Sequence, residues 1–527
     1  MLLLREHEAA HWLPFLNLHH DGWTTENGKV AALGTSISLI DQSWKHREIA
    51  LLLTVGNSSH VAGDGKRMIC TRTLNVYGVD IEKMVPFSVS DTASAARKVS
   101  KLFVESSQTN CSMHVLNLCL QYAMGLRENK ETVEVYYPVT NTRKREQHYC
   151  TVGGAFEEGR DLIKNVRALN NYFSTQLRCK RLEEVQALFK LPKLKTVVDC
   201  DTRVGFTLKL FQRTIVNYKT FSVYFQKCKK GDDATGFDRL ALAAWRLLVE
   251  MEAICRPTGD LARFEVQSSE LVASELFVLL KSAADRLNSG VFSVCDLESP
   301  RTTTTTVKTF PRFDVVATDP TPLTQTCLAR LKGQIKQRIA NVTAEMVMTL
   351  LLDPRTKSSI ETLARPPFQH DAASKNIETT EIVAADSIIA SGKRLLRDAH
   401  REVYCTQSQA SRGAIQSETT NTLPNLNLVP SAEDDTTICG AAVPMTNAGF
   451  TSLSTLHDQA DKILEKWLQY SVAWVSMVLH QAPKPTTTMD SLTAMLMVDA
   501  KGSTAGMSRL SVSTSIFCAG FGRLDPL

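Results

Sequence analysis

Two aspartates near the start of the chain have the surroundings that metal-dependent phosphoryl transfer requires. Asp21 ends a strand-like segment that begins at Phe15, and Asp91 follows a second one, Val85 to Ser90. Carboxylates at adjacent strand ends can hold two divalent ions, one activating the attacking oxygen and the other stabilising the leaving oxygen. Because oxygen ligands suit Mg²⁺ or Mn²⁺, we predict that Asp21 and Asp91 are catalytic metal ligands. The alternative from spacing alone places Asp21 in a turn and Asp91 at a helix N-cap.

The segments around these aspartates predict a mixed α/β unit. Three β-prone segments in close succession indicate an antiparallel meander, and helices then alternate with a fourth strand. The expected elements are strands at 15–21, 30–40 and 48–55, a helix at 64–75, a strand at 85–90, a helix at 93–103 and a further helix-like pattern at 113–123. This order is that of an RNase H-like core, a mixed sheet flanked by helices.

Five motifs, in order along the chain, resemble those of hAT-family DNA transposases. The first two, around Asp21 and Asp91, resemble the segments that carry two of the family's catalytic aspartates. The third begins at Cys111, twenty residues after Asp91. The motifs are 21–25 (DGWTT), 89–96 (VSDTASAA), 111–118 (CSMHVLNL), 166–173 (VRALNNYF) and 351–357 (LLDPRTK). Each is weak alone, but together and in this order they are specific.

The resemblance implies an RNase H-like core interrupted by a large all-α insertion domain. It also implies that Asp21 and Asp91 are metal-binding catalytic carboxylates and that Trp23 belongs to the first motif. In the third motif, it implies that Cys111 is buried on a strand and that His114 forms a hydrogen bond near the active site. The third carboxylate of the family is a Glu far downstream, after the insertion, in an SxxER-FS-type motif.

The sequence departs from the family where that third carboxylate is expected. Residues 511–520 (SVSTSIFCAG) resemble the motif faintly, but they contain no Glu, and no acidic residue lies between Asp499 and Asp525. We therefore expect an incomplete active site and a C-terminal dimerisation region that is largely missing. The zinc-finger domain that often precedes the core is also expected to be missing, because Asp21 lies close to residue 1. Residues 201–204 (DTRV) stand where many relatives have a TRW sequence.

Beyond residue 150 the apolar spacing becomes helical, which is what a helical insertion would require. Polar, Ser- and Thr-rich stretches interrupt it, and the longest of them is too poor in large apolar residues to be expected to fold. The expected organisation is 1–150, first part of the core; 151–300, helical insertion; 301–322, Thr/Pro-rich linker; 323–404, helical continuation with the LDPRTK motif; 405–455, disordered linker; and 456–527, C-terminal helix and degenerate tail.

Positive charge is concentrated in residues 178–230, which have thirteen Lys or Arg and four acidic residues, a net charge of +9. Clustered basic charge favours binding to the DNA backbone. The candidate DNA-binding residues are Lys190, Lys193, Lys195, Lys227, Lys229 and Lys230. The alternative is a solvated polar face on amphipathic helices, with Phe206, Phe211, Tyr218 and Tyr224 in the core, and the sequence leaves both open.

The cysteines favour neither a disulfide scaffold nor a zinc site. There are thirteen of them, with no C-x-x-C pair, which indicates a reducing compartment. Cys111 and His114 form half of a zinc site whose nearest second half would be His148 and Cys150. We favour the hydrogen-bonding role instead, because structural zinc sites usually have tighter ligand spacing.

The bulk composition excludes a membrane role. The 527 residues are 43% hydrophobic and 22% charged, as in ordinary globular proteins. The longest apolar stretch, Ile49 to Val55, has the length of a strand and is too short to span a membrane. The apolar run at Met1 to Leu4 is too short for a signal peptide.

Together these observations predict a transposase-derived nuclear protein that binds double-stranded DNA and holds Mg²⁺ or Mn²⁺ weakly. It would be inactive because the third carboxylate is missing, and a homo-oligomer remains compatible with it. One alternative is a working metal-dependent transposase that takes its third carboxylate from an unexpected residue, such as Glu26 or Glu48. The others are a non-enzymatic nuclear interaction protein and a decayed product without function.

Overall fold

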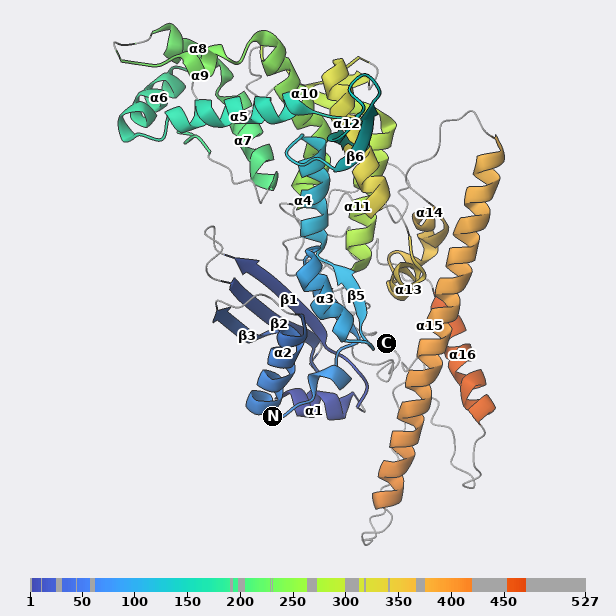
Figure 1. Ribbon diagram of the computed structural model, residues 1–527. Helices are drawn as coiled ribbons and strands as arrows, with labels where there is room; N and C mark the ends of the chain where they lie inside the picture. The colour runs from blue at the N-terminus through green and yellow to red at the C-terminus, as the bar shows by residue number, and fades with distance from the viewer. Residues whose placement is uncertain are drawn as a thin grey trace, which may run out of the picture.

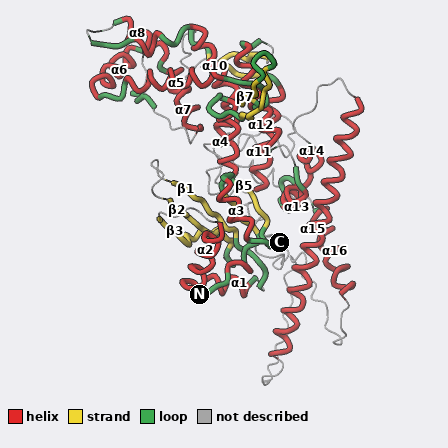
Figure 2. Tube along the Cα trace, viewed as in Figure 1, coloured by secondary structure: helices red, strands yellow, loops and turns green. Residues whose placement is uncertain are grey.

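The aspartate-bearing segments fold into one mixed sheet, which forms one end of the molecule in the computed structural model (Figures 1 and 2). The structure describes residues 2–470 except 11, 25–30, 44, 57–61, 190–192, 198–203, 228, 230, 263–272, 299–311, 317–318, 340–341, 366–374 and 419–452. Within these ranges, no helix has the length and apolar character needed to cross a membrane.

The sheet has five strands in the order β3-β2-β1-β4-β5. They are β1 (Asn17–Thr24), β2 (Ala31–Ile40), β3 (His46–Gly56), β4 (Phe87–Ser90) and β5 (Ser107–Asn110). The first three form an antiparallel meander, while β4 and β5 run parallel to β1. The predicted meander and fourth strand are confirmed. The sequence analysis missed β5, because its residues SQTN are all exposed and show no apolar alternation.

Helices cover one face of this sheet. They are α2 (Ala62–Tyr77) and α3 (Ser94–Leu102), with α1 (Leu2–Ala9) and the short η1 (Ile81–Lys83) alongside. Leu18, Ile37 and Leu39 on the strands pack with Ile69 and Val99 on the helices in one buried cluster. Because side chains alternate along a strand, Leu18 and His20 point into this cluster, whereas Asp21 points to the opposite face and is exposed.

A long helix, α4 (Ser112–Ala123), leads from the sheet into the helical part of the molecule (Figure 1). It packs against α7 (Val204–Val216), α10 (Leu242–Asp260) and α12 (Pro322–Arg338), and Cys119, Leu120 and Ala123 join the large core of that region. The remaining helices are α5 (Glu157–Tyr172), α6 (Gln176–Leu188), α8 (Tyr218–Gln226), α9 (Thr235–Asp238), α11 (Ala273–Ser289), α13 (Ala344–Leu352), η3 (Lys357–Ser359), α14 (Ile360–Ala364), α15 (Lys375–Glu418) and α16 (Leu453–Gln469).

The structure differs from the expected organisation in four places. A hairpin, β6 (Lys130–Tyr137) and β7 (Thr142–Tyr149), precedes the helical region. A second antiparallel pair joins β8 (Val291–Cys295), within the expected helical insertion, to β9 (Arg312–Val316), within the expected linker. Within the expected helical insertion, α7 and α8 are separate helices, because buried Asn217 lies between them and its side chain bonds back to the Arg213 carbonyl. Helix α15 extends to Glu418, into the segment expected to be disordered. Residues 419–452 and 471–527, the latter including the tail segment at 511–520, lie outside the described residues.

Candidate functional site

Asp21 and Asp91 lie on neighbouring parallel strands. The last residue pair between β1 and β4 joins His20 to Ser90, so each aspartate is the next residue along its own strand. Asp91 directly follows β4, whereas Asp21 lies within β1, three residues before its end, and pairs with Gly34 of β2. Trp23 follows in the same strand, paired with Ala32. The two carboxylates therefore belong to one edge of the sheet.

Asp91 is held by two contacts that both involve the same carboxylate oxygen. Its Oδ1 accepts a 2.7 Å hydrogen bond from the Ala93 amide, and Nε2 of His114 lies 3.2 Å from that oxygen. The N-cap alternative is wrong, because the N-cap residue of α3 is Ala93. The Asp91 side chain is 18% exposed, and Oδ2 has no partner among the described residues. One oxygen thus fixes the carboxylate and the other remains free to bind a cation.

His114 reaches Asp91 because α4 begins beside the end of β4. The Cys111 amide donates a 2.7 Å hydrogen bond to the Ser90 carbonyl, which fixes the start of the helix at this edge. His114 lies in the first turn and therefore points to Asp91, in keeping with the role that the resemblance implies. The strand placement of Cys111 is wrong, because this residue is the half-buried N-cap of α4.

His20, which the sequence analysis did not select, ties the aspartate-bearing strand to the helix that follows Asp91. Its Nε2 shares a 2.8 Å hydrogen bond with Oγ of Ser100 on α3, and both side chains are buried. Burial, together with the neighbouring charge of His19, lowers the pKa of His20 from 6.5 to about 4. The fold therefore holds a neutral imidazole one residue before Asp21.

This histidine should make the fold sensitive to acid. Because the pKa of His20 is lower in the folded chain, the unfolded chain binds a proton first as the pH falls. The free energy of unfolding should therefore be highest above about pH 6.5 and should fall between pH 6.5 and about 4. The part due to His20 is at most about 3 kcal/mol. Urea unfolding across this range should show a smaller loss for His20→Gln. Ser100→Ala is the control, because it removes the hydrogen bond but keeps the buried imidazole, and it should retain the wild-type slope.

No third acidic, Cys or His side chain completes a metal-binding group with this pair among the described residues. Glu48, considered above as a substitute ligand, is wrongly placed for that role. It pairs with Ser38, four residues along β2 from Gly34, the partner of Asp21. Glu26 lies outside the described residues. The described site therefore offers the Asp21 carboxylate and Oδ2 of Asp91 as candidate oxygen ligands.

The zinc alternative is not supported by the geometry. Cys111 and His114 lie at the start of α4, whereas Cys150 bonds through its amide to Asn129, whose side chain accepts from Tyr122 at the other end of that helix. Twelve helical residues span about 18 Å, far more than one ion can bridge.

Several basic side chains of residues 178–230 form hydrogen bonds or ion pairs with other residues of the protein. Arg181 forms a two-pronged ion pair with Asp232, Arg213 donates to the Lys195 carbonyl, and Lys219 donates to the Glu298 carbonyl. Of the aromatic residues that the solvated-face alternative places in the core, Phe211 and Tyr224 are buried and Tyr218 packs against the core, but Phe206 is exposed. Of the candidate DNA-binding lysines, Lys193, Lys195, Lys227 and Lys229 are exposed, with Lys193 3.5 Å from Glu183. Lys190 and Lys230 lie outside the described residues.

The LDPRTK motif forms a buried ionic cluster that does not include Asp21 or Asp91. Arg355 is fully buried and donates to Asp353 and to Glu275 on α11. Lys357 donates to the Trp467 carbonyl on α16, and the Trp467 indole donates to the Leu351 carbonyl. Burial lowers the pKa of Lys357 to about 8. The motif thus joins α11, α13 and α16, which is a structural role.

Compared with protein-family models and with curated proteins, the chain matches none. Its function must therefore be argued from its own residues. The strongest local feature is the sheet edge that carries Asp21, Asp91 and His114.

Proposed function

We propose that this chain is a transposase-derived, DNA-binding protein with an RNase H-like core and an incomplete metal site. The observation that carries the proposal is the parallel pairing of β1 with β4, which brings Asp21 and Asp91 to one sheet edge. The strand order β3-β2-β1-β4-β5 fits the expected core, and the large helical region after α4 fits the expected insertion. The motif resemblance supplies the family, and the nucleus is the compartment that a DNA partner implies.

The site residues fit an oxygen-binding divalent ion. Asp21 has no hydrogen-bond or ion-pair partner for its carboxylate among the described residues, and Asp91 keeps Oδ2 free. Such an ion, Mg²⁺ or Mn²⁺, would supply charge neutralisation for a DNA phosphate. The chain's own part is to orient Asp91 through Ala93 and His114 and to present both carboxylates at the exposed edge. Without a cation, two carboxylates would repel a phosphate from this edge.

Mn²⁺ binding tests this site directly. Titration followed by electron paramagnetic resonance should give one weak Mn²⁺ site in the wild type. Asp21→Asn and Asp91→Asn should each weaken it by roughly tenfold or more, because each removes one of two charged ligands. Glu48→Gln is the matched control, since it removes one exposed carboxylate from the far end of the same sheet. It should leave the affinity unchanged.

Two results would contradict the proposal. Equal Mn²⁺ affinity in the wild type and Asp91→Asn would show that Asp91 is not a metal ligand. Loss of binding in Glu48→Gln would show that the ion lies elsewhere on the protein. The DNA-binding part is tested separately, with a mixed-sequence duplex. The wild-type chain should bind it with an affinity that falls as salt rises, because phosphate contacts release counterions.

A further inference from the structure

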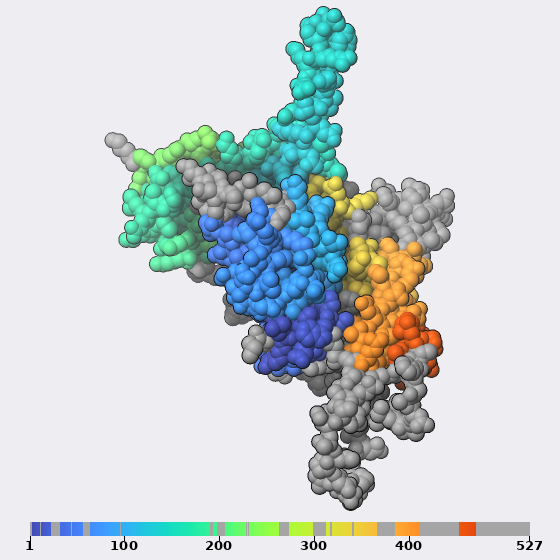
Figure 3. Space-filling model, turned by 60° about the horizontal axis from the view of Figure 1, so that its bottom comes forward, coloured from blue at the N-terminus to red at the C-terminus, as the bar shows by residue number. Residues whose placement is uncertain are grey.

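The β6–β7 hairpin is a free-standing arm. Figure 3 shows it as a finger that projects away from the rest of the molecule. Every residue of its two strands is exposed except Val135 and Glu146, which are half-buried. A two-stranded hairpin with no covering layer is marginally stable by itself in water. An arm of this kind therefore needs a strong anchor at its root, and its exposed surface needs a separate explanation.

The outer half of the arm is basic and ends in an apolar tip. Residues 135–145 contain Arg143, Lys144 and Arg145 and no acidic residue. The turn between the strands exposes Val139 almost completely, at 97%, beside Pro138. Of the acidic residues of the arm, Glu131 and Glu146 lie nearer the root, whereas Glu134 lies opposite Arg145, whose Nε is 3.3 Å from Oε1 of Glu134. Arg143 and Lys144, which lie nearer the tip, therefore carry the arm's positive charge beyond this ion pair.

The strand register distributes the three cations over both faces of the ribbon. Arg143 pairs with Tyr136 and Arg145 pairs with Glu134, which places both arginines on one face. Lys144 pairs with Val135 and lies on the other face, 5.4 Å from the centre of the Tyr137 ring. A ribbon inserted into a groove of duplex DNA has a phosphate backbone on each side. Cations on both faces suit that arrangement.

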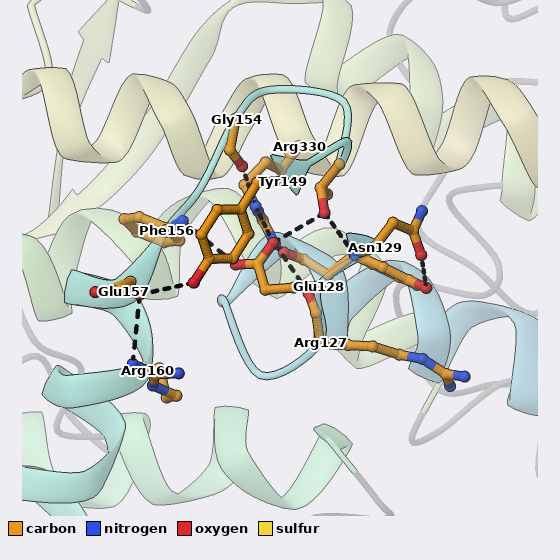
Figure 4. Close-up of polar contacts among 11 residues, drawn as sticks. Arg127, Glu128, Asn129, Tyr149, Gly154, Phe156, Glu157, Arg160 and Arg330 are labelled. Atoms are coloured by element: carbon orange, nitrogen blue, oxygen red, sulfur yellow. Dashed lines mark hydrogen bonds and ion pairs between the residues drawn. The ribbon is translucent and has the colours of Figure 1, made fainter. Parts of the chain in front are cut away.

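The root of the arm is locked by buried Arg330 of α12, which points into the loops at both ends of the hairpin (Figure 4). Its guanidinium donates to the Tyr122 carbonyl at 2.6 Å, to the Arg127 carbonyl at 3.0 Å and to Glu128 at 2.9 Å. It also donates to the Gly154 carbonyl. Both strands are thereby fastened to α4 and α12.

Two further contacts tighten the root. Glu128 also accepts from Thr151, and Tyr149 at the end of β7 donates to Glu157 at the start of α5. Gly153 has a φ of +90°, and a Cβ there would lie 2.6 Å from Cγ of Arg330, so only glycine fits. The arm is therefore held in place before any partner arrives, which lowers the ordering cost of binding.

We propose that the β6–β7 arm is a DNA-binding ribbon that enters a groove of the duplex. Its cations would contact phosphates on both sides, and its Pro138–Val139 tip would lie against the bases. This inference rests on the proposed DNA-binding function and assigns its interface. The major groove, about 12 Å wide, admits a two-stranded ribbon. An acidic protein or an anionic membrane would not need cations on both faces.

The test is duplex binding by the full chain at several salt concentrations. In one variant Arg143, Lys144 and Arg145 are all changed to Ala. Its affinity should fall by roughly tenfold or more, and its salt slope should become shallower by about 0.9 per lost phosphate contact. The matched control changes Lys393, Arg394 and Lys462 to Ala, an equal charge loss at exposed positions of α15 and α16. It should keep the wild-type affinity within about twofold.

A second variant guards against misfolding of the arm. Val139→Asp adds one negative charge at the almost fully exposed tip, without removing any contact that the structure shows, and should also weaken binding. Thermal unfolding should be unchanged in both variants.

Four outcomes would overturn the assignment. If the wild type does not bind duplex DNA, the proposed function and the arm assignment fail together. If it binds and both arm variants bind equally well, only the arm assignment fails. An equal loss in the control would show a general effect of net charge. If the arm variants lose binding to phosphatidylserine vesicles but keep DNA binding, the arm's partner is a membrane.

Discussion

Arg330→Leu is expected to destabilise the folded chain by about 3–5 kcal/mol, the cost of removing one partner of a buried ion pair. The substitution leaves Glu128 without its buried cation and removes the donor for three carbonyl groups, those of Tyr122, Arg127 and Gly154. Each buried acceptor left unpaired adds a desolvation penalty. Chemical denaturation followed by circular dichroism measures the loss in the free energy of unfolding.

Arg338→Leu is the control for this prediction. Arg338 lies on the same helix, α12, but it is exposed. Among the described residues it bonds to Gln334, one turn away, and contacts the Tyr122 ring. Its substitution should cost less than about 1 kcal/mol. Hydrogen exchange should also be faster in residues 130–149 of Arg330→Leu. If Arg330→Leu is as stable as Arg338→Leu, the root of the arm is held by something other than this network.

The sheet could be predicted from the sequence wherever one of its faces is buried. In β2, the buried Ile37 and Leu39 alternate with serines because one face of the sheet packs against α2 and α3. The alternation fails in β5, where SQTN is exposed throughout, and in the β6–β7 arm, which has no buried face. No local sequence pattern identifies Arg330 as the anchor of the arm either, because its partners lie about two hundred residues away in the chain.

The candidate site was predictable to a similar degree. Strand-end reasoning finds Asp21 and Asp91, since carboxyl ends of parallel neighbours meet at one edge. It does not find the His20–Ser100 bond, which joins residues eighty apart. The LDPRTK motif was visible in the sequence, but its role was not. That role depends on Glu275 and Trp467, which come from helices far away in the chain.

The largest effect is expected in DNA cleavage. The purified chain should not cut or join duplex DNA at a transposase-like rate. Two-metal phosphoryl transfer needs enough fixed carboxylates to hold both ions and to stabilise the charge that develops in the transition state. The described site offers Asp21 and one free oxygen of Asp91, and the tail segment at 511–520, which faintly resembles the family's motif for the third carboxylate, has no Glu. Water filling the vacant ligand position neither neutralises charge nor fixes geometry.

The cleavage rate of the purified chain should be at least about a hundredfold lower than that of a transposase with a complete site. Misplacing the reacting groups by about 1 Å already lowers a rate by about that factor. The measurement is cleavage of a labelled duplex in Mg²⁺ and in Mn²⁺, with Asp91→Asn as the control. Wild type and control should give the same background rate, although Asp91→Asn binds Mn²⁺ more weakly than the wild type. Robust cleavage that Asp91→Asn abolishes would instead mean that another acid completes the site. Glu26→Gln would then identify it, because Glu48 lies at the wrong end of the sheet to reach Asp21.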